Sequence, residues 1–65
     1  MEITAKILTK EQMIKGLIVD EPDDHTVVLR HGEHIIGRYN SNRVLITELR
    51  QDADNYLNGI EFTKQ

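Results

Sequence analysis

The stretch that most constrains the fold runs from His25 to Gly59, because it joins a β-hairpin pattern directly to an amphipathic helix pattern. Its first part reads HTVVLRHGEHIIGRYN, in which two runs rich in β-branched residues flank a His-Gly turn signal. Its second part contains LITELRQDADNYLNG, in which apolar residues recur at helical spacing. A hairpin alone is marginally stable in water, so we expect the helix to cover it.

The sequence leaves two pairings of the hairpin open. A two-residue turn at positions 31–32 pairs Arg30 with Glu33, an attractive pair of opposite charges. A three-residue loop shifts the pairing by one and sets Leu29 opposite Ile35. Both pairings put apolar residues on both faces of the hairpin. We therefore expect one face to pack on the helix and the other to be covered by a partner or left partly exposed.

In the pairing with the two-residue turn, the apolar residues divide between the faces as follows. Val28 and Ile35 share one face with Thr26 and Gly37, and the other face carries Val27, Leu29 and Ile36 with His34. The hairpin itself is expected over residues 25–39.

The final helix is expected over residues 46–58. One apolar stripe defines it, made of Ile46, Leu49, Ala53, Tyr56, Leu57 and Ile60. Two starts remain open, one near Ile46 and one with Ser41 or Asn42 as the cap of a longer helix. Asn58-Gly59 predicts its end. The stripe fits packing against the hairpin, and it also fits a dimer seam.

The N-terminal residues 2–8 alternate apolar and polar side chains, which predicts a half-buried strand, although a helix also fits the spacing of Ile3 and Ile7. Thr9 and Gln12 form a T-x-x-Q capping box, so a short helix is expected over about residues 10–15. Gly16 should end this helix. A short apolar strand is expected over residues 17–19, followed by the DEPDD sequence as a mobile loop.

These elements predict a single α+β domain of residues 1–65. A small antiparallel sheet, made of the N-terminal strand, the short strand and the central hairpin, packs against the C-terminal α-helix, and a short N-terminal helix completes the domain. A domain of 65 residues buries only about 60% of the surface that its unfolded chain exposes. With no cysteine to form disulfides, self-association is an expected source of additional stability.

Charge is unevenly distributed along the chain. The formal net charge is −3, yet residues 25–50 carry all four arginines and all three histidines against two acidic residues. Arginine suits planar recognition of carboxylate or phosphate, so an anionic partner would bind there, unless these side chains are merely solvated. No apolar run approaches the ~20 residues of a membrane span, and the N-terminus lacks a basic signal-peptide region, so we expect no membrane partner and a cytoplasmic location.

No residue constellation identifies a catalytic chemistry. His31 and His34 lie near the hairpin turn, whereas His25 belongs to the opposite end, so the three histidines cannot form one site. Hydroxyl residues have no elbow or triad context, and no glycine-rich phosphate loop is present. We therefore expect a protein that is not an enzyme, with no metal site and no cofactor.

One family resemblance concerns the order of the elements and the residues Gly32, Glu33 and His34. A helix, three antiparallel strands and a helix, with glycine just before a histidine on a strand, is distantly similar to the small HicA-type toxin ribonucleases, whose fold resembles double-stranded-RNA-binding domains. The resemblance covers about residues 9–58. The family pattern is glycine, serine, histidine, and this chain has Glu33 in the middle position. The resemblance implies that His34 acts as general acid/base and that Arg30 and Arg38 position phosphate.

Two functional hypotheses follow from the sequence. The first is a small non-enzymatic protein-interaction module that binds a protein partner or itself as a homodimer. The second is an RNA-binding or RNA-acting domain that uses the arginine-rich hairpin. The expected contact residues are Val27, Leu29, Arg30, His34, Ile36, Arg38 and Tyr39.

Overall fold

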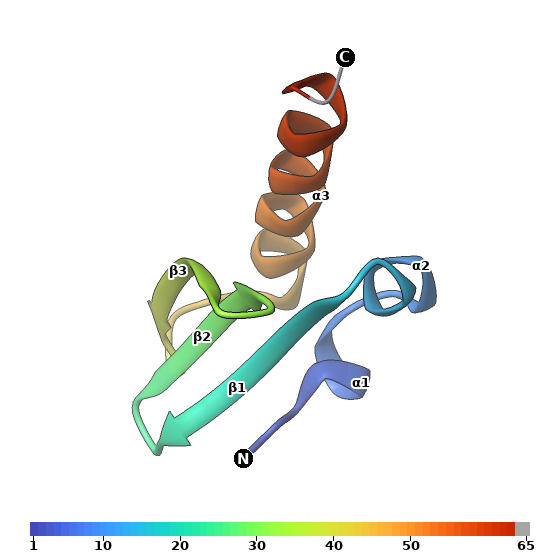
Figure 1. Cartoon of the computed structure of the whole chain (residues 1–65). Helices are drawn as coiled ribbons and strands as arrows, with labels where there is room; N and C mark the ends of the chain where they lie inside the picture. The colour runs from blue at the N-terminus through green and yellow to red at the C-terminus, as the bar shows by residue number, and fades with distance from the viewer. Residues whose placement is uncertain (64–65) are drawn as a thin grey trace.

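The structure is a computed structural model that describes residues 1–63, with side chains described as far as Ile60. Within this range the elements follow in the order α1 (Thr4–Ile7), α2 (Lys10–Ile14), β1 (Leu17–Asp23), β2 (Thr26–His31), β3 (His34–Asn40) and α3 (Ile46–Thr63). The strands form one antiparallel sheet in the order β1-β2-β3. The helices α1 and α2 contact β1. The first part of α3 packs on the sheet through buried side chains, and the helix then extends away from the strands (Figure 1). This arrangement confirms the predicted small α+β fold.

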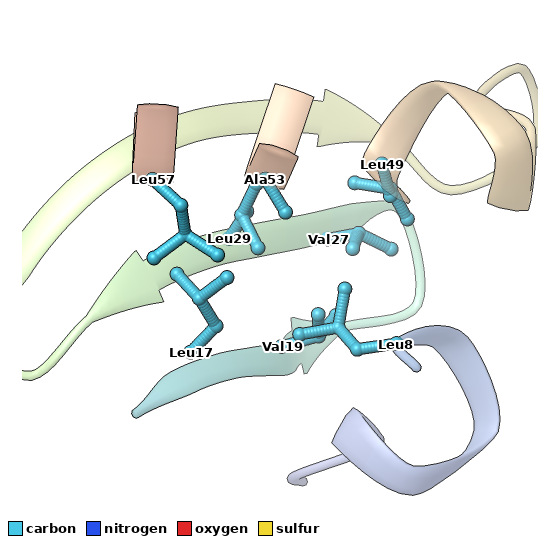
Figure 2. Packing of buried hydrophobic residues seen from close by; sticks show 8 residues of the cluster. All are labelled: Leu8, Leu17, Val19, Val27, Leu29, Leu49, Ala53 and Leu57. Carbon is cyan, nitrogen blue, oxygen red and sulfur yellow. The ribbon is translucent and has the colours of Figure 1, made fainter. Parts of the chain in front are cut away.

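The hydrophobic core lies between α3 and the sheet, as Figure 2 shows. Three α3 residues four apart in the sequence point toward the strands, namely Leu49, Ala53 and Leu57. They meet buried side chains from the sheet and from the end of α1, namely Leu8, Leu17, Val19, Val27 and Leu29. Full burial of each large apolar side chain contributes about 1.5–3 kcal/mol. The helix stripe therefore packs against its own hairpin.

Residues 2–8 do not form the strand that their alternation predicts. Glu2 makes an isolated β-bridge to Asp20, and Thr4–Ile7 forms one turn of helix. The buried Thr4 hydroxyl accepts a hydrogen bond of 3.0 Å from the Val19 N–H and donates to the Val19 carbonyl at 3.5 Å. Apolar spacing fits both a strand and a helix over so few residues, and these contacts with β1 decide between them.

The capping box at the start of α2 is present as predicted. Thr9 Oγ1 accepts from the Gln12 N–H at 3.3 Å, and Gln12 Oε1 accepts from the Thr9 N–H at 3.0 Å. The helix ends before Gly16, whose φ of 94° lies in the left-handed region that glycine adopts without a Cβ clash. Both local signals therefore act as the sequence indicates.

The first strand is longer than the predicted residues 17–19, because it continues through Pro22 to Asp23 instead of breaking there. A register shift between Asp20 and Asp23 accommodates the extra residues. Proline is tolerated at edges and bulges, where its missing N–H is not needed by the ladder. The N-terminus also covers this edge, since the Glu21 N–H donates to the Met1 carbonyl at 2.7 Å.

The turn between β1 and β2 is held by the Asp23 carboxylate. Its Oδ1 accepts a hydrogen bond of 2.8 Å from the backbone N–H of His25. This bond, followed by a side-chain hydrogen bond from Thr26, lowers the pKa of Asp23 below its ordinary value. The acidic loop expected here is thus an ordered turn joining two strands.

The hairpin adopts neither of the two predicted pairings. Its two-residue turn falls at Gly32 and Glu33, one residue later than expected, and His31 pairs with His34. Gly32 has a φ of 60°, a value that two-residue hairpin turns require and that glycine supplies readily. Moving the turn by one residue shifts the pairing by two positions, so the faces near the turn stay as the two-residue pairing predicts.

A bulge in β3 follows the turn. Arg30 pairs with Ile35, but Leu29 pairs with Gly37, which leaves Ile36 as the extra residue. As a result Ile36 and Gly37 both lie on the side of α3, and Ile36 packs against the core. Gly37, which was predicted on the face of Val28 and Ile35, therefore lies on the opposite face, because the extra residue reverses the alternation beyond the bulge.

The final helix begins at Ile46, which is one of its two predicted starts, and the longer helix capped by Ser41 or Asn42 does not form. It continues past the predicted end at residue 58 to Thr63. Gly59 does not take the left-handed conformation that would end a helix, since the positive φ values of the described residues belong to Gly16 and Gly32. Ile60, beyond it, packs against the core. This packing carries the helix through the glycine.

Candidate interaction surface

The sheet has a second face, opposite α3, which we call the outer face. Paired residues of neighbouring strands share a face, and successive residues of a strand alternate between faces. The ladder therefore places Ile18, Arg30 and Ile35 in one row of the outer face. A second row contains Asp20, Val28 and Arg38. The outer face ends with Thr26 and Asn40.

Apolar side chains occupy part of this outer face. Ile35 is 44% exposed, and Ile18 and Val28 are half-buried. These three residues do not belong to the core cluster or to the half-buried residues packed on it. Within residues 1–63, the helices contribute their buried side chains to the opposite side of the sheet. The outer face is thus a separate, uncovered apolar surface.

Charged groups flank these apolar side chains. Arg30 Nε lies 2.6 Å from Asp20 Oδ2, and its Nη1 donates to the Gly32 carbonyl at 2.7 Å. Side-chain exposure of 31% for Arg30 and 28% for Asp20 leaves this ion pair in contact with solvent. Arg38 lies on the same face and is exposed. The surface therefore carries both signs of charge around an apolar centre.

The hairpin turn contacts α3 on the other side of the sheet. His31 Nδ1 lies 3.2 Å from the Tyr56 hydroxyl, and its Nε2 lies 3.2 Å from the Lys15 carbonyl. Because a carbonyl only accepts, Nε2 carries the proton and, in the neutral imidazole, Nδ1 accepts from Tyr56. The His34 ring stacks on Tyr56 with centroids 5.5 Å apart and planes at 21°. These contacts anchor the turn to the helix and leave the outer face unaffected.

Tyr39 makes a second link between β3 and α3. Its hydroxyl donates to Asp52 Oδ2 at 2.7 Å. Partial burial, and then this bond to a carboxylate, raise the pKa of Tyr39 above its ordinary value. Tyr39 is thus a neutral donor that fixes the edge strand to the helix.

A groove of about 530 Å³ separates α2 from α3. Charged residues of both signs line it, including Lys10, Glu11, Arg50 and Asp54. The buried Gln12 amide fills its hydrogen-bonding capacity within the protein, since Nε2 donates to the Arg50 carbonyl and to Asp54 Oδ1. No described side chain has a buried polar atom without a partner that could await a ligand. The groove is a solvated seam between two helices.

The predicted contact residues divide between the two faces. Five of them lie on the side of α3, where Val27 and Leu29 are buried in the core, Ile36 and Tyr39 pack on it, and His34 stacks on Tyr56. The remaining two, Arg30 and Arg38, lie together on the outer face.

This division separates the residues of the RNA hypothesis. His34 lies on the side of α3, whereas Arg30 and Arg38 lie on the opposite face of the sheet. A general acid/base and its phosphate-positioning groups must reach the same phosphate. RNA binding stays a prediction, and these three side chains do not form a single site for it.

Sequence reasoning missed four members of the candidate surface, namely Ile18, Asp20, Val28 and Ile35. Ile18 lies within the short strand predicted over residues 17–19, and Asp20 directly follows it. The ladder between β1 and β2 places these two residues beside Arg30 and Val28. For Val28 and Ile35 the signal was present, because the alternation of the hairpin sets them together on one face, but the opposite face was chosen for the contact.

Other types of site find no support among the described residues. No three histidine, cysteine, aspartate or glutamate side chains gather in residues that could hold a metal ion. The helices of the described range are also too short or too polar to cross a membrane.

Comparison with known proteins returns no relative. No protein-family model, curated protein sequence or solved structure matches the chain significantly.

Proposed function

We propose that this chain is a small non-enzymatic protein-interaction module that self-associates through the outer face of its sheet. The observation that carries the proposal is that α3 covers one face of the sheet, while Ile18, Val28 and Ile35 lie uncovered on the other. A three-stranded sheet with apolar residues on both faces gains stability when both faces are covered. A cytoplasmic location belongs to the same proposal.

Self-association of the wild-type chain is the first measurement. Sedimentation equilibrium from about 10 µM to 1 mM covers the weak range expected for interfaces smaller than the standard size. The mass should rise with concentration toward that of a dimer. A mass that stays monomeric up to 1 mM would contradict the proposal.

A matched pair of variants locates the contact surface. Ile35 on the outer face and Ile14 on α2 are both exposed isoleucines, with 44% and 78% exposure, so neither substitution disturbs the core. Ile35→Lys places a second positive charge beside Arg30 in the proposed contact and should weaken self-association at least about tenfold, because buried like charges repel one another and lose their hydration. Ile14→Lys should leave self-association unchanged. Equal effects of both variants would place the contact elsewhere.

A further inference from the structure

The outer face carries a pattern that is complementary to itself in one orientation. Its two rows place an acidic residue, Asp20, on β1 and a basic residue, Arg38, on β3, with Val28 between them on β2. In the neighbouring row, Ile18 on β1 and Ile35 on β3 flank Arg30 on β2. β1 and β3 lie at equal distances of about 4.8 Å on either side of β2. A rotation about β2 therefore exchanges them.

We infer that two copies of this chain pack outer face to outer face about a two-fold axis parallel to β2. This inference rests on the proposed function and specifies how its two copies meet. The rotation places β1 of one copy over β3 of the other, and each row of one copy faces the same row of the other copy. Asp20 then faces Arg38 of the second copy twice, Ile18 faces Ile35 twice, and Val28 faces Val28. Packed sheets with strands aligned in this way are a common arrangement.

The alternative face-to-face orientation is unfavourable. A two-fold axis perpendicular to the strands keeps each strand on itself and exchanges the two rows. Ile18 would then face Asp20, Val28 would face Arg30, and Ile35 would face Arg38. Each apolar side chain would cover a charge, which loses both the apolar contact and the hydration of the charge. Charge complementarity therefore selects the axis parallel to β2.

Arg30 is the one residue that meets its own copy with like charge. Its guanidinium already binds Asp20 at 2.6 Å and the Gly32 carbonyl at 2.7 Å. In the dimer, Asp20 lies between Arg30 of its own chain and Arg38 of the second copy. The dimer face then holds two carboxylates and four guanidiniums, and each Asp20 carboxylate is shared by two of them, which offsets part of the repulsion between the two Arg30 side chains.

A charge-exchange experiment tests this arrangement. Asp20→Arg creates two Arg–Arg contacts in the dimer and Arg38→Asp creates two Asp–Asp contacts, so each variant alone should self-associate at least about tenfold more weakly. An equimolar mixture restores opposite charges at both contacts and should form a heterodimer at least as tight as the wild-type dimer. Sedimentation equilibrium measures all three samples. Asp24→Arg and Arg43→Asp, two exposed charges outside the two rows, provide the matched controls and should leave the dimer unchanged.

The outcomes separate the arrangement from the proposed function. A wild-type chain that stays monomeric at about 1 mM overturns both. A wild-type dimer whose mixed variants do not recover association overturns the arrangement alone. Because Asp20→Arg also removes the partner of Arg30, the unmodified chain supplies a second test. An isotope-filtered NOE in a mixture of labelled and unlabelled chains should connect Ile18 methyls with Ile35 methyls of the other copy, and its absence in a proven dimer would overturn the arrangement.

Discussion

The hydroxyl of Tyr39, on the edge strand β3, donates a 2.7 Å hydrogen bond to Oδ2 of Asp52 on α3. This bond fixes the bulged strand to the helix that covers the sheet. It also requires space over Gly37, because a Cβ there would lie 2.7 Å from the Tyr39 hydroxyl oxygen. The strand, the glycine and the helix therefore depend on one another.

Tyr39→Phe should lower the free energy of unfolding at pH 7 by about 1.5–3 kcal/mol, the range for a hydrogen bond to a charged group. The pKa of Tyr39 is raised in the folded state, first by burial and then by Asp52. Its contribution is therefore complete below the unfolded pKa of about 10 and is lost as the pH rises above it. Urea unfolding of both proteins from pH 7 to 11 should show their difference shrinking above about pH 10. A difference that stays constant would show that the hydroxyl does not titrate as described. Tyr56 is present in both proteins, so its contribution cancels in the difference between their free energies of unfolding.

Gly37→Ala should destabilise the protein because the added Cβ displaces the Tyr39 ring and breaks its bond to Asp52. Contacts under 3.0 Å require movement, and the tyrosine ring is the group that meets the new carbon. Gly37→Ala and Tyr39→Phe should therefore be non-additive by about 0.5–3 kcal/mol in a double-mutant cycle, as residues in contact are. Additive effects would mean that the ring accommodates the methyl group without moving.

Two glycine substitutions should have opposite signs. Gly16→Ala should cost about 1–2 kcal/mol, because Gly16 has a φ of 94° and its added Cβ would lie 3.3 Å from His31 Nε2. Gly59→Ala should stabilise the protein by about 0.5–1 kcal/mol, because this position is helical and its added Cβ meets nothing within 4 Å. Thermal or urea unfolding measures both. A destabilising Gly59→Ala would show that α3 ends near the residue 58 that the sequence indicates.

Gln12→Leu should destabilise the protein more than Thr9→Ala. Thr9→Ala removes one half of the capping box and should cost about 1 kcal/mol. Gln12→Leu removes the other half and also leaves the Arg50 carbonyl and Asp54 Oδ1 without the amide that they accept from. Loss of these partly buried bonds adds about 1–3 kcal/mol. Equal effects of the two variants, measured by urea unfolding, would mean that the Gln12 side chain acts on α2 alone.

The sequence predicted correctly those features that depend on contacts between residues close together in the chain. Thr9 and Gln12 form their capping box within a single turn, so four residues of sequence contain all the groups involved. The residues of the apolar stripe of α3 also follow from spacing alone, whereas its start at Ile46 and its packing on the hairpin are each one of two alternatives that the sequence left open. The division of the hairpin faces survived an incorrect turn as far as Ile36, because a shift of two positions preserves the alternation of side chains, but it failed at Gly37 beyond the bulge.

Contacts between distant segments decided the remainder. The hydrogen bonds between Thr4 and Val19 make the N-terminal segment a helical turn, and the cover of the β1 edge by Met1 lets that strand run through Pro22. The alternation of apolar and polar residues does not predict the bulge at Ile36, because the bulge adds one residue to one strand only. These features together place Ile18, Asp20 and Arg38 on a common face.

The sequence by itself determined the fold class, the helix cap and the residues able to form a core, because these depend on local hydrogen bonds and on the period of apolar side chains. Only the tertiary structure decided which face of the hairpin the helix covers and which face remains. That choice depends on strand register, which is set by pairing between segments and by the helix that packs on them. The surface proposed for self-association is therefore a product of the register.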